Sequence, residues 1–299
     1  MNADSPAIAV RHDAEAAAAL FPALLLEAAR IAQSVSAGLH GRRRAGPGET
    51  FWQHRPYAFG DPVSNIDWRQ SARAADRLYV RQNEWEAAAA AYLWRDPSRS
   101  LDYASSKNVP TKRRRADILV TALTMLLSKA GERIGLLGEE RRPFQGRTAP
   151  ERILEALHID LFDDAAGAPP LTTTPAGARI VMASDFFTNP DGIAAAVASL
   201  TASGAKGVLL QICDPAEEEF PFIGRTEFRD LESADKLIIG KTESVSQLYK
   251  EKFTAHRDAL INIARKNGWV FIAHRTDAPP QTILLALFTA LADLRSWKS

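Results

Sequence analysis

Cysteine is nearly absent from the sequence, and this scarcity excludes chemistry that depends on several thiols. Cys213 is the single cysteine among 299 residues, so neither an intramolecular disulfide nor a cysteine-based zinc cluster can form. A lone cysteine of this kind is most simply a small core residue. Low cysteine usage is typical of a reducing compartment, and we expect a cytoplasmic location.

Long apolar runs are also missing. The longest uncharged apolar stretch near the start covers residues 16–26 and contains Pro22. A membrane-spanning helix needs roughly 18–20 apolar residues, so this stretch is too short. The sequence therefore predicts neither a membrane span nor a cleavable signal peptide.

The chain has no excess charge of either sign. Lysine and arginine number 37 against 36 aspartates and glutamates, which gives a net charge of +1. No overall field therefore draws the protein to nucleic acid or to an anionic membrane. Hydrophobic residues make up 46% and charged residues 24%, a composition typical of a globular protein and too apolar for a disordered one.

Apolar runs and helical patterns alternate from about residue 85 onward. Strands are expected at residues 87–94, 133–137, 179–183, 208–212 and 269–273, and helices at residues 111–130, 148–158, 189–202, 245–264 and 283–294. Strands that alternate with helices predict a Rossmann-like α/β fold with a mostly parallel sheet covered on both faces. We assign this pattern to a domain of residues 83–299, with a β-ribbon insertion near residues 217–240.

The first part of the chain, residues 1–82, combines an expected helix at residues 14–39 with a segment rich in arginine, glycine and proline. In this segment, eight arginines face only four acids. The residues proposed as a structural arginine network or a partner-binding surface are Arg42, Arg43, Arg55, Asp61, Asp67, Arg69, Arg73 and Arg81. These arginines either pair with carboxylates elsewhere in the chain or bind phosphate, nucleic acid or an acidic protein surface.

Candidate metal ligands follow two of the expected strands. Asp96, Ser98 and Ser100 form a D-x-S-x-S motif after the first strand, and Asp185 follows another. Ligands of parallel α/β sheets bind beyond the carboxyl ends of the strands, and Mg²⁺ or Mn²⁺ prefers such oxygen ligands. Thr148, at the start of a helix, could add a hydroxyl. Each of these residues could instead cap a helix or complete a turn.

These motifs and the segment before them resemble known proteins. The D-x-S-x-S motif and Asp185 resemble the metal-ion-dependent adhesion site of von Willebrand factor A-like domains. Residues 38–299 are similar to the domain of unknown function 58 family, whose hallmark run is matched by Gly41-Arg-Arg-Arg-Ala-Gly-Pro-Gly-Glu-Thr-Phe51, Arg55-Pro-Tyr57, Asn65-Ile-Asp-Trp-Arg69 and Leu78-Tyr-Val-Arg81. The resemblance implies a bacterial protein with a von Willebrand factor A-like domain that binds a MoxR-type AAA+ ATPase.

Three functions follow from these observations. The first is a non-enzymatic, metal-dependent protein-interaction module that works with the ATPase in maturation or assembly of other proteins. The second is metal-dependent phosphoryl transfer at Asp96 and Asp185, although the sequence has no P-loop and no histidine close to either aspartate. The third is nucleic-acid binding by the arginine-rich segment. We expect the first, with Mg²⁺ or Mn²⁺ as cofactor.

Overall fold

A computed structural model of the chain describes residues 25–36, 51–58, 63, 66–73, 77–83, 90–139, 142–159, 167–229, 231 and 235–296. The chain forms two compact units. The smaller unit consists of residues 42–88, and the larger unit combines residues 1–41 with residues 89–299. Whereas the sequence analysis grouped residues 1–82 together, the structure includes the N-terminal helix in the larger unit.

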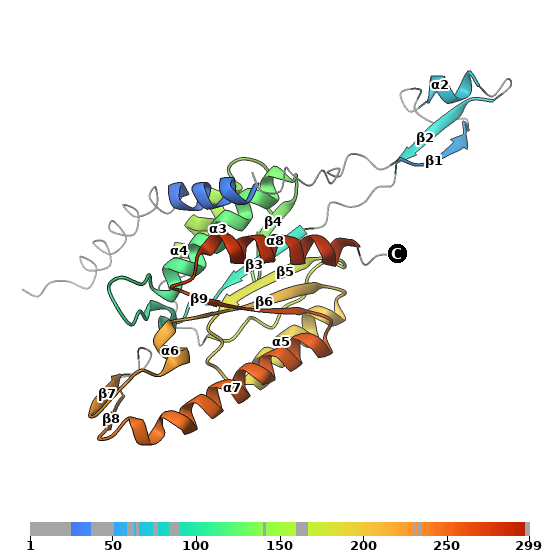
Figure 1. Cartoon of the computed structure of the whole chain (residues 1–299). Helices are drawn as coiled ribbons and strands as arrows, with labels where there is room; N and C mark the ends of the chain where they lie inside the picture. Colours follow the sequence, from blue (N-terminus) through green and yellow to red (C-terminus); the bar gives the residue numbers. More distant parts are fainter. Residues whose placement is uncertain are drawn as a thin grey trace, which may run out of the picture. The chain divides into compact units, whose positions relative to one another are not determined.

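A five-stranded sheet forms the centre of the larger unit (Figure 1). All neighbouring strands are parallel, in the order β4-β3-β5-β6-β9. The strands are β3 (Ala90–Arg95), β4 (Arg133–Leu136), β5 (Arg179–Ser184), β6 (Lys206–Cys213) and β9 (Val270–Arg275). The expected Rossmann-like α/β architecture with a mostly parallel sheet is thereby confirmed.

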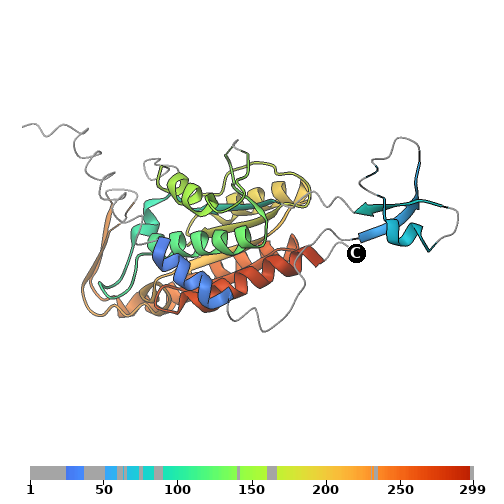
Figure 2. The same cartoon turned by 90° about the horizontal axis from the view of Figure 1, so that it is seen from above.

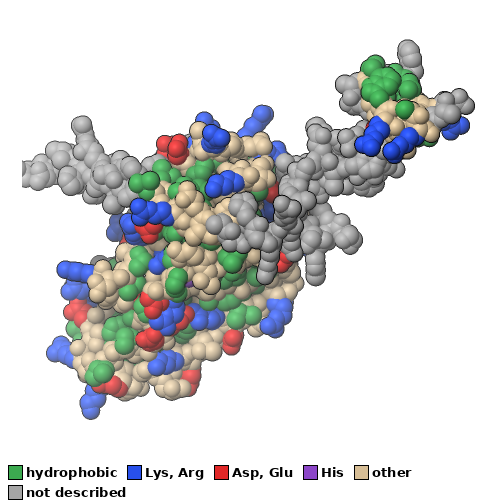
Figure 3. Space-filling view, turned by 45° about the horizontal axis from the view of Figure 1, so that its top comes forward, with side chains coloured by type: hydrophobic (Ala, Val, Ile, Leu, Met, Phe, Trp, Pro, Cys, Tyr) green, Lys and Arg blue, Asp and Glu red, His purple; other side chains and the backbone are tan. Residues whose placement is uncertain are grey.

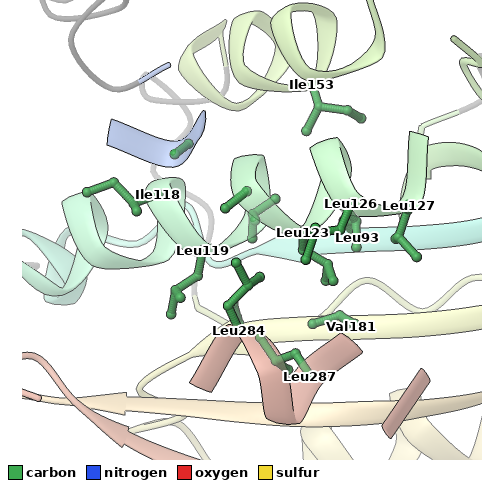
Figure 4. Close-up of a cluster of buried hydrophobic side chains, with 14 of the residues drawn as sticks. Leu93, Ile118, Leu119, Leu123, Leu126, Leu127, Ile153, Val181, Leu284 and Leu287 are labelled. Carbon is green, nitrogen blue, oxygen red and sulfur yellow. The ribbon is translucent and has the colours of Figure 1, made fainter. Parts of the chain in front are cut away.

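Helices cover both faces of this sheet (Figure 1), and Figure 2 looks down on one of the two helix layers. One face carries the helix at residues 25–36, α3 (Lys112–Lys129), α4 (Ala149–Ile159) and α8 (Pro280–Ser296), and the other carries α5 (Pro190–Ala202) and α7 (Glu243–Lys266). The first face buries a core of aliphatic side chains in which Leu119 and Leu123 of α3 lie close to Leu284 and Leu287 of α8 (Figure 4). Burial of such side chains stabilises the fold by roughly 1.5–3 kcal/mol each.

Local sequence signals explain where α3 begins and ends. The Thr111 side chain accepts a hydrogen bond from the Arg114 amide, which caps the helix N-terminus. Gly131 follows the helix with a φ of +78°, a left-handed conformation that glycine adopts without steric cost. The observed α3 therefore agrees closely with the helix expected at residues 111–130.

A β-ribbon extends from the larger unit between β6 and α7. Its antiparallel strands are β7 (Thr226–Arg229) and β8 (Lys236–Ile239), and the short helix α6 (Pro215–Glu219) precedes them. The Phe220 ring stacks on the Tyr249 ring of α7 at 4.5 Å between centroids. This aromatic contact fixes the base of the ribbon on α7.

The smaller unit contains two antiparallel strands, β1 (Phe51–Pro56) and β2 (Tyr79–Asn83), and the short helix α2 (Trp68–Ser71). Asp67 caps α2, because its side chain accepts a hydrogen bond from the Gln70 amide at 3.0 Å. Among the described residues of both units, no helix is long and apolar enough to cross a membrane.

Candidate functional site

The candidate site lies at the carboxyl ends of β3 and β5. The chain leaves β3 to form β4 on one side and then returns to form β5 on the other side. Ligands of parallel α/β sheets bind at such switch points, beyond the strand ends. Asp96 directly follows β3, and Asp185 directly follows β5.

Asp96 is a fully buried carboxylate held by neutral donors. Its Oδ1 accepts the Ser98 amide at 2.8 Å, and its Oδ2 accepts the Ser184 hydroxyl at 2.5 Å. Within the described part of the chain, no lysine, arginine or histidine forms an ion pair with Asp96. A buried carboxylate without a cationic partner is costly, so this position favours binding of a cation.

The two serines of the motif lie beside this carboxylate. The hydroxyl oxygens of Ser98 and Ser100 are 2.9 Å apart and share a hydrogen bond. Ser100 belongs to a short 3-10 helix, η2 (Arg99–Asp102). Arg113 of α3 holds this loop in place, since its Nη2 donates to the Ser98 carbonyl at 2.8 Å and to Asp102 Oδ2 at 3.1 Å.

Gly167 packs against Asp96 and Ser98. A β-carbon at this residue would lie 2.9 and 3.1 Å from the two Asp96 carboxylate oxygens and 3.0 Å from Ser98 Oγ. Three oxygens therefore face the Gly167 backbone, and an added methyl group would press on all three. The oxygen donors of Asp96 and Ser98 suit a hard cation such as Mg²⁺, which binds oxygen at about 2.0–2.1 Å.

Asp185 has a different partner from Asp96. Its Oδ2 accepts a hydrogen bond from Lys112 Nζ at 2.7 Å, and its Oδ1 accepts the Phe187 amide at 3.1 Å. The same ammonium group lies 2.5 Å from Glu217 Oε1 of α6. Only 1% of the Lys112 side chain and 2% of the Asp185 side chain are exposed, against 14% for Glu217, so the three charges form a largely buried triad.

The charges of this triad explain the directions of two pKa shifts. The pKa of Lys112 lies above its ordinary value. Burial alone would lower this pKa, but the attraction of the Asp185 and Glu217 carboxylates together has a larger effect in the opposite direction. Burial raises the pKa of Glu217, although Lys112 opposes the shift. One ammonium group cannot fully compensate two buried carboxylates, so the triad carries excess negative charge.

Backbone strain next to Asp185 marks this turn as a constrained position. Phe186 has a φ of 57° and is fully buried, a conformation that is unfavourable for a bulky residue. The Ser184 hydroxyl accepts the Phe186 amide at 2.7 Å, and His256 Nε2 lies 2.8 Å from the Phe186 carbonyl. These contacts hold the Asp185 carboxylate toward Lys112.

The structure brings four of the five expected metal ligands to this edge and places the fifth elsewhere. Phe144 pairs with Ile134 of β4 in an antiparallel bridge, and Gln145 donates to the Gly131 carbonyl. The chain has therefore returned to the amino end of the sheet before Thr148, which is exposed at the start of α4. Assigning Thr148 to the metal site was wrong, because α4 begins at the opposite edge.

The residues of the expected arginine network are described only in part. Asp67 caps α2, and Arg69 and Arg73 are exposed at and after this helix. Arg55 and Arg81 belong to the paired strands β1 and β2. The residues outside the described ranges are Arg42, Arg43 and Asp61, and the side chains of Arg55 and Arg81 also lie outside them.

The sequence analysis missed Lys112, Glu217, Ser184 and Gly167. Ser184 could have been found, because it precedes Asp185 at the end of the same strand. The described residues include no group of three or more histidine, cysteine, aspartate or glutamate side chains that could hold a metal. The candidate site at Asp96, Ser98 and Ser100 contains one carboxylate and two hydroxyls, so it is not a group of that kind.

The comparisons with known proteins assign the chain to a family. Residues 53–259 match the family described as "Protein of unknown function DUF58". The chain belongs to the DUF58 family. The matched range includes the candidate site from Asp96 to Glu217.

Two mycobacterial relatives show how far the similarity extends. An uncharacterized protein of Mycobacterium bovis is 27% identical over 274 residues, which cover 83% of this chain and 82% of the relative. An uncharacterized protein of Mycobacterium tuberculosis strain H37Rv is similar to the same extent. No solved structure matches the chain.

Proposed function

We propose that this DUF58 protein is a non-enzymatic protein-interaction module that binds its partner through a divalent cation, Mg²⁺ or Mn²⁺, at the carboxyl edge of the sheet. The observation that carries this proposal is the buried Asp96 carboxylate, which lies beside two serine hydroxyls and has no ion-pair partner among the described residues. The cation would compensate the charge of Asp96.

The arrangement of the ligands supports a von Willebrand factor A-like domain as the finer fold class. The D-x-S-x-S motif follows β3, and Asp185 follows the neighbouring strand β5. Asp96, Ser98 and Ser100 would contact the cation, and Asp185 would lie at the same edge. Because Mg²⁺ usually keeps several waters, one position stays open to a carboxylate of the partner.

The described side chains at this edge support binding rather than catalysis. Neither Ser98 nor Ser100 hydrogen-bonds to a described histidine, so no activated hydroxyl nucleophile is formed. Cys213 is buried, and burial raises the pKa of its thiol to about 12. A thiol with so high a pKa is a poor nucleophile at neutral pH.

We propose a MoxR-type AAA+ ATPase as the partner. The basis is the resemblance of the arginine-rich segment and of the D-x-S-x-S motif to the DUF58 family, which implies such a partner. A partner carboxylate would complete the metal shell in a partly dehydrated interface, where opposite charges attract more strongly than in water. The ATPase and this module would then act together in the maturation or assembly of other proteins.

A pull-down from the native host tests this function. Wild type, Asp96→Asn and the exposed control Asp191→Asn are compared with and without a chelator, and circular dichroism verifies their folding. We expect wild type and Asp191→Asn to recover the ATPase only without chelator, and Asp96→Asn to lose it. Equal recovery by all three proteins, with and without chelator, would contradict a metal-mediated contact.

Nucleic-acid binding by the smaller unit is the alternative. Trp68 is 62% exposed and is followed by the exposed Arg69 and Arg73, a combination that suits base stacking and phosphate contacts. On the larger unit, by contrast, acidic and basic side chains are interspersed over the face seen in Figure 3. Single-stranded DNA binding that weakens steeply with salt and is lost in Trp68→Ala would favour this alternative.

A further inference from the structure

Lys112 already supplies a cation to the edge of the sheet. It is the first residue of α3, and its ammonium group reaches both the end of β5 and α6. The group lies 5.1 Å from the centroid of the Phe187 ring and 5.7 Å from that of the Tyr103 ring. Two carboxylates and two aromatic rings therefore surround it, which fixes its position and excludes water.

The contacts of Asp185 leave no oxygen of this carboxylate without a donor. One oxygen accepts the Phe187 amide and the other accepts Lys112. Asp96, in contrast, receives only neutral donors. The two aspartates thus lie at the same edge of the sheet but differ in their partners. Asp185 is paired with the Lys112 ammonium group, whereas Asp96 has no cationic partner among the described residues.

We propose that Lys112 is a tethered cation that competes with the divalent metal for Asp185. This inference rests on the proposed function. In the resting protein the metal contacts Asp96, Ser98 and Ser100, while Asp185 stays paired with Lys112. Glu217 provides a second carboxylate, because its Oε1 lies 2.5 Å from Lys112 Nζ. Lys112 would remain paired with Glu217 when Asp185 coordinates the metal.

The competition lowers metal affinity in the resting protein. A metal that recruits Asp185 must displace an ammonium group from a buried hydrogen bond, and the attraction between Lys112 and Asp185 opposes that step. A partner carboxylate that adds to the metal shell would favour the displacement. Lys112 therefore links metal affinity to partner binding through the position of one side chain.

The test removes the competitor without changing the net charge of the triad. Replacing Lys112 alone would leave two buried carboxylates unpaired, which endangers folding. The double variant Lys112→Met/Glu217→Gln removes one positive and one negative charge together. In this variant the glutamine can still accept the Asp214 amide, as Glu217 Oε2 does at 2.8 Å.

A second buried ion pair provides the matched control. Arg179 and Glu132 form a pair with exposures of 5% and 8%. Arg179 begins β5, whereas the site follows the end of this strand. The double variant Arg179→Met/Glu132→Gln therefore removes a buried ion pair at the opposite edge of the sheet.

Mn²⁺ binding to each purified protein is measured by electron paramagnetic resonance of the free ion. We expect Lys112→Met/Glu217→Gln to bind Mn²⁺ at least about tenfold more tightly than wild type, as an added carboxylate ligand would allow. Adding Asp185→Asn should abolish this gain, and the control pair should bind as wild type does. In the wild-type background, Asp185→Asn should weaken binding less than about threefold, because Asp185 is not a resting ligand.

The outcomes separate this inference from the proposed function. Equal Mn²⁺ affinity of wild type and Lys112→Met/Glu217→Gln would overturn the competition while leaving the metal site intact. A loss of tenfold or more in Asp185→Asn alone would also overturn it, even if the double variant failed to fold. Tight binding by the double variant without binding by wild type would support Lys112 as competitor and reject a metal in the resting protein. Absence of binding in both folded proteins would overturn both proposals.

Discussion

The Ser184 hydroxyl donates a hydrogen bond to Asp96 Oδ2 at 2.5 Å and so joins the end of β5 to the end of β3. The same hydroxyl accepts the amide of Phe186, the residue that follows Asp185. Ser184 therefore connects the Asp96 carboxylate to the backbone turn that carries Asp185. This connection keeps both carboxylates at one edge of the sheet.

Replacing Gly167 should weaken metal binding without unfolding the protein. The added methyl group of Gly167→Ala would press on the Asp96 and Ser98 oxygens. We expect at least a tenfold loss of Mn²⁺ affinity in calorimetry. Gly192→Ala is the control, because a β-carbon there meets no atom within 4 Å. Unchanged affinity in Gly167→Ala would show that the Asp96 and Ser98 oxygens do not bind the metal.

Replacing Gly207 should destabilise the sheet. A β-carbon there would lie 2.6 Å from both the Ile180 carbonyl oxygen and the Trp269 ring, so β6 would have to move away from β5. We expect Gly207→Ala to lower the free energy of unfolding by about 1–3 kcal/mol, measured by urea denaturation. A stability equal to that of wild type would show that Trp269 can shift at little cost.

The Cys213 thiol should be unreactive in the folded protein. Burial, with a smaller contribution from Glu217, raises the pKa of this thiol to about 12, so almost no thiolate exists at pH 8. Iodoacetamide should label the protein only after denaturation, as followed by mass spectrometry. Rapid labelling of the native protein at this pH would show that the end of β6 opens to solvent.

Acid should destabilise the fold through His274. Burial lowers the pKa of this β9 histidine to about 4, and Arg115 of α3 adds to the shift, whereas Asp277 opposes it. Between pH 6.5 and 4 the unfolded state therefore binds a proton that the folded state does not, and stability falls by about 1–3 kcal/mol as the pH decreases.

His274→Leu provides the comparison for this pH effect. Urea unfolding at several pH values should show a flatter dependence for the variant than for wild type over this window. Identical slopes for the two proteins would assign the acid sensitivity to other groups.

The sequence predicted the part of the site that depends on strand order along the chain. Apolar runs marked β3 and β5, and the carboxyl ends of parallel strands lie at one edge, so the placement of Asp96 and Asp185 followed. The pairing of Asp185 with Lys112 could not be predicted in this way. A lysine directly after a helix cap is ordinarily exposed. Here Lys112 is buried because Asp185, Glu217 and two aromatic rings from other parts of the chain surround it.

The error at Thr148 has a similar physical reason. The sequence indicated a short hairpin around residues 139–142 and a helix that begins near Thr148. The bridge between Phe144 and Ile134 carries this hairpin back to the start of β4, a consequence that the assignment of Thr148 left out. This return places the start of α4 at the edge of the sheet opposite Asp96. The helix was therefore predicted correctly, but Thr148 at its start was wrongly assigned as a metal ligand.

The most direct test of the account is Mn²⁺ binding by Asp96→Asn beside wild type. Asparagine keeps the shape of the side chain and can still accept the Ser98 amide, so the fold should persist while the buried negative charge is lost. We predict that wild type binds one Mn²⁺ in electron paramagnetic resonance titrations and that Asp96→Asn binds none. Equal Mn²⁺ binding by the two folded proteins would contradict a metal site at Asp96.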